Sequence, residues 1–459
     1  MDIPFLVMLG IYMLVMVGIS VADSCKTADF KSYAVAGKDQ RLITVTMTLM
    51  ATILGASTTI GITDTVYQIG FPGIWWLAFG AVGLLLQSLL LSERVRGMNA
   101  DTLPHLTEML AGRSASFLLA LIIVISWIGV VAGQLVALGG LVTFATGKDS
   151  KILLAVVAVL VILYTTLGGQ LSVVKTDRIQ LVVIIAGILL CFGYLFGTTE
   201  GSFRDATGQI EFFNESYTVQ KWITQFFVIG GVFFLGPDIL SRNFIAKDGR
   251  TAKRSALLAA GSLLIFAVII SMIGVWARLN VPAEELGGNK TLLYVARLLP
   301  GWMRLIMSLG LMSAILSSTD TCLINAASIF SRDILRKEDK KIVRFAVLGI
   351  GALALGLTLL SSGNIINILS GAYSIYTPGV IFPLLVAIFS YKKRNIRKKL
   401  WMTGVCAGGL CGVMSTFCGE WMTGAGVPSA IVDNLTLIGM GLSLIFSLLS
   451  VIHSGSREQ

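Results

Sequence analysis

One stretch of the chain places acidic and hydroxyl side chains among residues that are otherwise apolar. Residues 311–330 contain a single aspartate, Asp320, and six serine or threonine residues. On a helix, four residues of this stretch share one stripe with Asp320 at its border, because they are spaced by three, one and three: Ala314, Ser317, Ser318 and Thr321. No lysine or arginine lies between Arg304 and Arg332. Since a carboxylate without a cationic neighbour is costly at membrane depth, the pattern indicates a site or pathway for a cation or a proton.

The composition agrees with a membrane setting for this stretch. Of the 459 residues, 55% are hydrophobic and 13% are charged, whereas a soluble chain carries about 25% charged residues. The mean hydropathy is +0.84. These values exclude a soluble protein and predict an all-α polytopic membrane protein. We expect residues 1–459 to form a single membrane domain, because no long polar block interrupts the apolar stretches.

Apolar stretches of about 20 residues recur from end to end, and each is long enough to cross a bilayer. We count thirteen candidate spans: 3–22, 43–69, 71–92, 115–146, 152–168, 178–198, 222–244, 255–277, 301–330, 343–361, 364–391, 400–419 and 428–452. With 23–42 as the first cytoplasmic loop, the loops on that side and the C-terminal segment hold 27 of the 35 basic residues. This bias predicts an N-terminus outside and a C-terminus inside. The net charge of +10 therefore reflects topology and lipid contact, and we expect no nucleic-acid partner.

Two spans carry helix-breaking residues in their interior. The second span contains Gly55–Gly61, GASTTIG, and the seventh contains Gly230-Gly231 followed by Gly236-Pro237. Breaks at membrane depth free backbone groups that protein, water or a solute must satisfy. Two broken spans that lie five spans apart are typical of an inverted repeat of five plus five helices, with binding sites at the breaks. Ordinary kinks with close helix packing are the alternative interpretation.

Several motifs resemble those of the sodium/solute symporter family, which includes proline, pantothenate, sialic acid and sodium/glucose transporters. Residues 165–180, TTLGGQLSVVKTDRIQ, are similar to the family's Gly-Gly…Thr-Asp…Gln signature. Residues 236–247, GPDILSRNFIAK, are similar to its Arg-x-x-x-x-Lys signature. The second span and the Ala314–Ser318 helix also match. The resemblance covers most of the chain and is specific for the family, but it does not identify a substrate.

The resemblance implies a LeuT-type fold. Residues 43–391 would form the ten-helix core of the 5+5 inverted repeat. Residues 1–42 would supply an extra first helix and loop, and residues 392–459 two extra C-terminal helices. The resemblance also implies secondary active transport driven by a sodium gradient, so Na⁺ is the expected coupling ion.

In this family one sodium ion lies between the broken first core helix and the eighth core helix. The matching ligands here are the carbonyls of Ala51, Leu54 and Ala314 and the hydroxyls of Ser317 and Ser318. Hydroxyls that bond to carbonyls one turn back on their own helix are the alternative interpretation of the two serines.

Some members of the family hold a second cation, and the matching residues here are Asp177, Ser317 and Thr321. Asp320 stands where those members usually carry a hydroxyl residue. Two carboxylates that meet in a low dielectric need a cation or a shared proton, so Asp177, Ser317, Asp320 and Thr321 form a candidate second cation site. Alternatively, Asp320 faces a cytoplasmic water cavity or caps a backbone group, and Asp177 pairs with Lys175 or Arg178.

We expect the solute to bind at the helix breaks. Freed N–H groups at a helix end favour an anionic group such as a carboxylate, and aromatic residues from other core helices would complete the pocket. The candidate residues are Gly55, Ser57, Thr58, Thr59, Trp76, Phe227, Phe233 and Tyr373. The pocket lacks the dense polar lining that a sugar requires, and we expect no buried arginine for an acidic sugar. Asp238 is expected to pair or to face water near a span end.

These patterns together predict a sodium-coupled symporter that imports a small carboxylate or amino acid by alternating access. A proton-coupled transporter that uses Asp177 and Asp320 is one alternative, and a sugar-type or sialic-acid-type sodium symporter is another. We expect a multi-pass protein of the bacterial cytoplasmic membrane with no obligatory protein partner and no metal other than sodium. No nucleophile–base pair or cofactor motif supports an enzyme.

Overall fold

The computed structural model describes residues 3–24, 29–199, 202–287, 290–361, 364–392 and 394–452, and this part of the chain folds into helices and connecting turns without a strand. Ten helical stretches of the described residues are long and apolar enough to cross a membrane, and a bent helix pair makes an eleventh span. The longer helices are α1 (Ile3–Ser24), α5 (Trp75–Leu90), α8 (Arg113–Thr146), α9 (Lys151–Thr198), α11 (Val219–Leu235), α13 (Gly249–Asn280), α16 (Gly301–Ile329), α17 (Lys340–Leu360), α18 (Ile365–Ser390), α19 (Lys398–Phe417) and α22 (Leu435–Ile452).

Shorter helices connect these elements and cover their ends. They are α2 (Phe30–Val35), η1 (Ala36–Lys38), α3 (Leu42–Ile53), η2 (Ser57–Gly61), α4 (Ile62–Ile69), η3 (Phe71–Ile74), α6 (Ser92–Gly97), α7 (Leu103–Ala111), α10 (Ser202–Gly208), α12 (Pro237–Ile245), α14 (Ala283–Leu286), α15 (Thr291–Leu298), η4 (Phe330–Ile334), α20 (Gly419–Gly424) and α21 (Ser429–Asp433).

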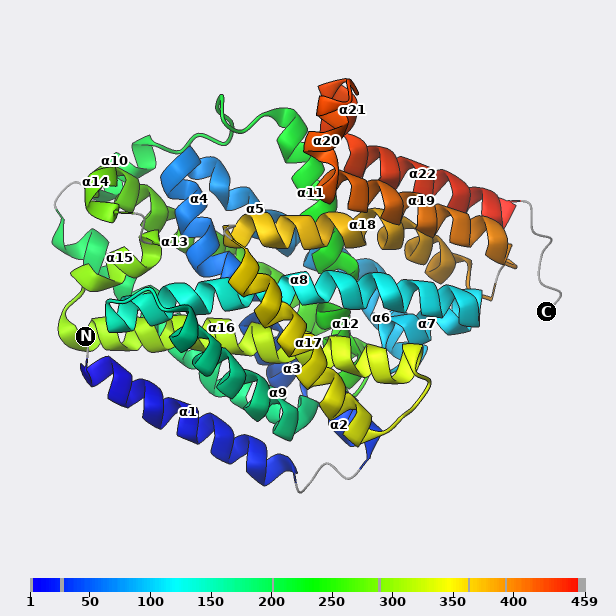
Figure 1. The fold of residues 1–459 in the computed structure, drawn as a ribbon, viewed down its shortest axis with the longest axis horizontal. Helices are drawn as coiled ribbons and strands as arrows, with labels where there is room; N and C mark the ends of the chain where they lie inside the picture. The colour runs from blue at the N-terminus through cyan, green and yellow to red at the C-terminus, as the bar shows by residue number, and fades with distance from the viewer. Residues whose placement is uncertain are drawn as a thin grey trace.

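Helix α16 runs through the middle of the molecule and packs against α9, α8 and α3 (Figure 1). Helix α1 lies along one flank beside α9, while α19 and α22 pack on α18 at the opposite flank. The stretch with the hydroxyl stripe therefore lies in the core, where residues 307–324 are all buried.

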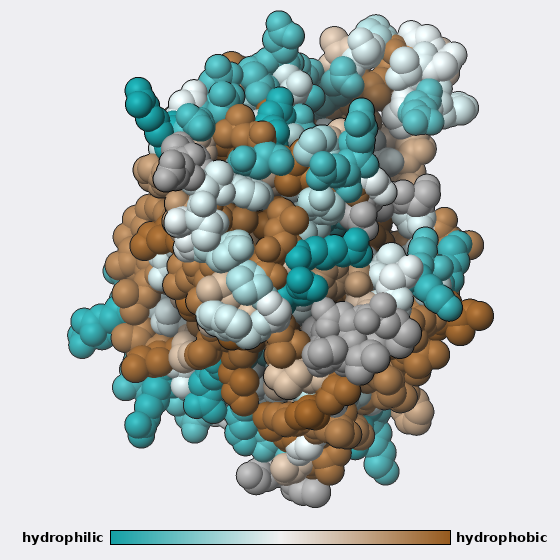
Figure 2. Space-filling view, turned by 90° about the vertical axis from the view of Figure 1, so that its left-hand side faces the viewer, coloured by the Kyte–Doolittle hydropathy of each residue, from teal (hydrophilic) through white to brown (hydrophobic). Residues whose placement is uncertain are grey.

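The outer surface is largely apolar. Leu14, Ile152, Phe345 and Leu360 are each more than 70% exposed, and apolar side chains cover much of the face shown in Figure 2, with hydrophilic side chains gathered toward its upper end. Such a surface is unfavourable in water and favourable in lipid. It agrees with the membrane setting that the composition predicts.

The two spans predicted at 152–168 and 178–198 are parts of one helical run, α9, which is interrupted at Gly169. Gly169 has a φ of +67°, and a Cβ there would lie 2.6 Å from the ring of Tyr33, so the bend requires glycine. A helix of 48 residues is about 72 Å long at 1.5 Å per residue. That length suffices for two crossings of a hydrocarbon layer of about 30 Å.

The predicted break in the second span is confirmed. Helix α3 ends at Ile53, a π-helical turn and α4 follow, and the two arms are bent by 57°. In the seventh span, α11 stops before Gly236 and α12 starts at Pro237, but the break predicted at Gly230-Gly231 is wrong. Both of these glycines lie within the helix α11. This part of α11 packs closely on α5 instead, since a Cβ on Gly83 of α5 would lie 2.2 Å from the carbonyl oxygen of Gly230.

Candidate ion and solute site

The break after α3 brings freed backbone groups against α16 and α8. The last carbonyls of a helix have no donor within it. In a continuous helix the N–H of Ala56 would donate to the carbonyl of Thr52, but here it donates to Oε1 of Gln134 on α8 (3.1 Å). The Thr52 carbonyl accepts instead from Oγ of Ser318 on α16 (2.7 Å). The hydroxyl stripe of α16 is thus in direct contact with the broken end of α3.

The five residues predicted to bind sodium lie on these two elements, and all are at most 3% exposed: Ala51, Leu54, Ala314, Ser317 and Ser318. Gly55 allows the approach, because a Cβ on it would lie 2.1 Å from Oγ of Ser318. Backbone carbonyls and hydroxyls are oxygen ligands of the kind that hard cations prefer. The assignment of sodium to these five residues stays a prediction.

A buried ion pair lies beside this contact. Asp177 of α9 accepts hydrogen bonds from Thr48 and from Ser317 Oγ (2.6 Å), and it pairs with Nη2 of Arg242 on α12 (3.1 Å). The same Nη2 donates to Oγ1 of Thr52 and to Oγ1 of Thr321, each at 2.6 Å. Asp177 and Arg242 are both 0% exposed. One guanidinium therefore joins α3, α9, α12 and α16.

Two expectations about charge are corrected by this pair. Asp177 does not pair with Lys175 or Arg178, because Lys175 bonds to Asp23 of α1 (2.5 Å) and Arg178 is exposed. The expectation of no buried arginine is also wrong, since Arg242 is completely buried. Its guanidinium is bound to Asp177 and to hydroxyl groups, and Arg242 does not line the cavity described below.

Asp320 has a separate set of partners. Its two oxygens accept from Tyr164 Oη and Thr165 Oγ1 of α9, each at 2.5 Å, and the residue is 1% exposed. The alternatives that it faces a water cavity or caps a backbone group are therefore wrong. Among the described residues no lysine, arginine or histidine forms an ion pair with it. Asp320 lies three residues after Ser317 on α16, and Asp177 accepts the hydrogen bond of Ser317. Of the two carboxylates, only Asp177 has a cationic partner among the described residues.

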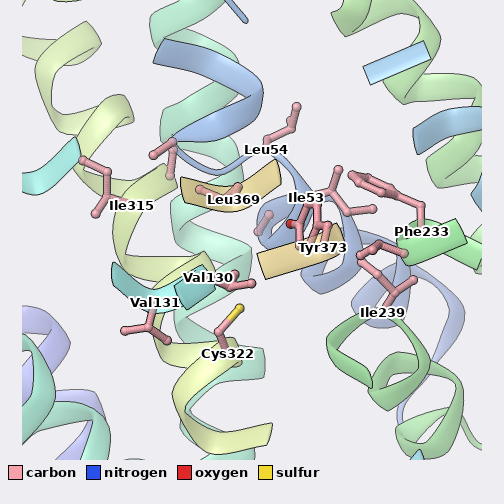
Figure 3. Close-up of a cluster of buried hydrophobic side chains, with 14 of the residues drawn as sticks. Ile53, Leu54, Val130, Val131, Phe233, Ile239, Ile315, Cys322, Leu369 and Tyr373 are labelled. Atoms are coloured by element: carbon pink, nitrogen blue, oxygen red, sulfur yellow. The ribbon is translucent and has the colours of Figure 1, made fainter. Parts of the chain in front are cut away.

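A cavity lies between the break of the second span, α8, the α11–α12 break, α16 and α18. Its free volume is about 20 Å³, room for about one water molecule, so a solute fits only after the lining side chains move apart. It is lined by Thr52, Ile53, Ser57, Thr58, Val130, Gln134, Val232, Phe233, Asp238, Ile239, Ser318, Cys322 and Tyr373. Figure 3 shows Ile53, Phe233, Ile239 and Tyr373 converging, with Val130 and Cys322 on adjoining helices. Because Ser318 also lines it, the cavity borders the predicted sodium site.

Four of the residues predicted to contact the solute line this cavity: Ser57, Thr58, Phe233 and Tyr373. The other four lie elsewhere. Gly55 packs against Ser318, Thr59 Oγ1 donates to the Gly55 carbonyl (2.7 Å), and Trp76 packs on the ring of Tyr373. Phe227 is 37% exposed and lines a separate apolar cavity between α5, α11 and α18.

Four polar residues of the cavity were missed in the sequence: Thr52, Gln134, Asp238 and Cys322. Gln134 carried a usable signal, because it is a single amide in a long apolar helix. Asp238 follows the Gly236-Pro237 break directly, so its proximity to a freed helix end could also have been read. Cys322 carried no signal beyond its place about one turn after Ser318 on the same helix.

The match to known proteins agrees with this geometry. Residues 33–408 match the model of the sodium:solute symporter family. The chain belongs to the sodium:solute symporter family. It is similar to two Bacillus subtilis (strain 168) proteins: the uncharacterized symporter YwcA, with 23% identity over 88% of this chain and 85% of YwcA, and the osmoregulated proline transporter OpuE, with 25% identity over 84% of each chain.

Solved structures support the fold. A Na⁺-coupled sialic acid symporter in a substrate-bound outward-open state matches with a TM-score of 0.78 and 18% identity, over 99% of both chains. MhsT in complex with L-phenylalanine matches with a TM-score of 0.60 and 13% identity, over 89% of this chain and 98% of MhsT. The fold is therefore LeuT-type, as predicted. This symporter is a multi-pass bacterial membrane protein that couples solute transport to Na⁺, and its family consists of secondary transporters and not of enzymes.

Replacing Arg242 by glutamine is expected to destabilise the symporter by about 3–5 kcal/mol, because it leaves the buried charge of Asp177 without a partner. The double variant Arg242→Gln/Asp177→Asn should recover part of this loss. Thermal unfolding of purified protein in detergent measures both effects.

Lys175→Gln is the matched control, since the Lys175 side chain is 33% exposed and its pair with Asp23 is more accessible to solvent. It should cost less stability than Arg242→Gln. A double variant that is less stable than Arg242→Gln alone would show that the charge of Asp177 is not what the guanidinium balances.

Proposed function

We propose that this symporter imports a small carboxylate or amino acid by alternating access, with one Na⁺ bound at Ala51, Leu54, Ala314, Ser317 and Ser318. The observation that carries the proposal is the hydrogen bond from Ser318 to the freed Thr52 carbonyl. It brings a hydroxyl of α16 to the broken end of α3, where backbone oxygens without helical partners are available. A sodium ion bound there would hold the two elements together in place of this hydrogen bond.

The position of the cavity supports coupling between ion and solute. Ser318 lines the cavity and belongs to the proposed ion site, and Ser57 and Thr58 of the break line the cavity as well. A solute in the cavity and an ion at Ser318 would therefore order the same broken helix. Each ligand would then favour the conformation that binds the other, and the rocking of the two helix bundles would release both to the cytoplasm.

The chemistry of the cavity favours a carboxylate or amino acid over a sugar. Five of its thirteen lining residues are apolar aliphatic or phenylalanine side chains, and four of the polar ones, Thr52, Gln134, Thr58 and Ser318, already hydrogen-bond to backbone groups, which leaves few for a sugar. No lysine, arginine or histidine is among the described residues that line the cavity, so a carboxylate there would depend on the freed N–H groups and the bound ion. The relative OpuE is described as a proline transporter, and the MhsT structure holds L-phenylalanine. Both names are consistent with an amino acid.

The competing proposal for the ion stoichiometry is a second cation bound at Asp177, Ser317, Asp320 and Thr321. In a variant of this proposal the coupled ion is a proton carried by Asp177 and Asp320. The contacts of Arg242 weigh against a second sodium, because its guanidinium already balances the charge of Asp177 and donates a hydrogen bond to Thr321 Oγ1. Asp320 keeps the second site open as an alternative, because it is buried without a cationic partner among the described residues.

Removing either serine hydroxyl should weaken sodium binding. We expect Ser317→Ala and Ser318→Ala to raise the Na⁺ concentration for half-maximal solute uptake by about tenfold or more, which corresponds to about 1.4 kcal/mol. Uptake into proteoliposomes at varied Na⁺, with K⁺ replacing Na⁺, measures this change.

Thr319→Val is the matched control on the same helix, because Thr319 is equally buried and its hydroxyl donates to the Ile315 carbonyl (2.6 Å) rather than to the break. Its Na⁺ dependence should stay within about twofold of the unmodified protein, since it loses only a local hydrogen bond. Uptake that is unchanged when K⁺ replaces Na⁺ would contradict the proposal.

The Na⁺ dependence of uptake also decides the stoichiometry. With Arg242 in place we expect a Hill coefficient near one in the unmodified protein and in Asp320→Asn. A coefficient near two that falls to one in Asp320→Asn would establish the second sodium site. A coefficient near one with uptake driven by a pH gradient in the absence of Na⁺ would instead support proton coupling.

A further inference from the structure

Asp238 is the acidic residue of the cavity, and one of its oxygens has no partner. It is the second residue of α12, directly after the break at Gly236-Pro237, and it is 8% exposed. Its Oδ1 is buried and accepts no hydrogen bond from the described residues. A buried carboxylate oxygen without a donor is costly. A donor from outside the protein chain would satisfy this oxygen.

The neighbouring cation does not meet this need. Arg242 lies one turn further along α12, but its guanidinium donates to Thr52, Thr321 and Asp177 and to Oγ of Ser241. No ion pair joins Arg242 to Asp238 in the described part of the chain, and no lysine, arginine or histidine lines the cavity. Asp238 thus has no directly bonded cation among the described residues, although the charge of Arg242, one turn away, acts on it.

We propose that Asp238 binds the ammonium group of the solute, so that the solute is an amino acid and not a simple carboxylate. This inference rests on the proposed function for the position of the solute. A protonated amine is a charge-assisted donor to a carboxylate, and it would supply both the hydrogen bond and the positive charge that the cavity lacks.

Other residues of the cavity lining can receive the carboxylate end of the same solute. Ser57 and Thr58 lie at the start of the helical segment after the break, and Ser318 lies beside the proposed ion. Freed N–H groups and a cation both favour an anionic group. A zwitterion would therefore have its two charges next to opposite charges at the two breaks, at α3 and at α11–α12.

The walls between these two ends limit the side chain of the amino acid. They are formed by Ile53, Val232, Phe233 and Ile239, and the cavity, with a free volume of about 20 Å³, must widen to admit a solute. A small or medium apolar side chain matches such a wall better than a charged or sugar-like one.

The test compares amino acids with matched carboxylates that lack only the amine. Thermal shifts of the purified full-length protein in Na⁺ would be measured with L-alanine and propionate, L-leucine and 4-methylpentanoate, and L-proline and cyclopentanecarboxylate, because a ligand that binds the native state raises its stability. We expect at least one amino acid to bind, and to bind at least tenfold more tightly than its partner carboxylate.

The isosteric variant Asp238→Asn then separates recognition from folding. It should weaken binding of that amino acid by about 10- to 100-fold, leave the matched carboxylate within about threefold, and keep the stabilisation that Na⁺ alone produces. Equal binding of the two compounds by the unmodified protein would overturn the proposal. So would an equal loss of both in the variant, or a response to sugars alone.

The same experiment distinguishes failure of this inference from failure of the proposed function. If amino acids bind equally well in K⁺ and in Na⁺, sodium coupling at Ser317 and Ser318 fails while the role of Asp238 stands. If Na⁺ stabilises the protein but none of the amino acids binds, the ion site stands and the role of Asp238 is refuted.

Discussion

The structure depends on one constraint, the need to satisfy backbone groups where a helix is broken inside an apolar medium. Each unsatisfied group costs several kcal/mol in hydrocarbon. At the break after α3, the Ala56 N–H is satisfied by Gln134 and the Thr52 carbonyl by Ser318. These contacts fix α8 and α16 against the break. The cavity and the proposed ion site exist because polar groups from three helices must meet at this point.

Charge balance sets the second limit on the site. Asp177, Asp238 and Asp320 are all buried in the region around α16 and α12, and Arg242 is the single basic residue in contact with any of them among the described residues. Its guanidinium balances Asp177, while Asp320 is held by two hydroxyls of α9 and Asp238 faces the cavity. The three carboxylates therefore have different roles available to them. Asp177 stabilises the fold, Asp320 is a candidate for binding a cation or proton, and Asp238 is a candidate for binding the solute.

The fold and the ion-site helix could be predicted from the sequence because they depend on local patterns. Apolar stretches of bilayer length, the Gly55–Gly61 break and the spacing of Ser317 and Ser318 are all visible within one segment. Arg242 could not be placed in this way, because it was counted among the basic residues of the cytoplasmic side. Its burial depends on Asp177, which lies 65 residues earlier in the chain.

The same limit applies to the solute cavity. Thr58 and Tyr373 were predicted for it, but Phe227 was predicted on residue type alone and lines a different cavity. Asp238 was expected to pair or to face water, because its position directly after Gly236-Pro237 indicated the end of a span. Which face of α11 turns inward is set by packing against α5 and α18, and which face of α12 by packing against α3, α6 and α16. That packing is not encoded within the segment itself.

The central claim is that Na⁺ and the solute bind at one break and stabilise the same arrangement of α3 and α16. The most direct test measures the affinity for a bound amino acid at low and at saturating Na⁺, and the affinity for Na⁺ without and with that amino acid, by equilibrium binding to the purified protein. Linkage requires the two affinities to change by the same factor. We predict a factor of at least five, which is lost in Ser318→Ala and kept in Thr319→Val. Two affinities that are each independent of the other ligand would contradict the claim.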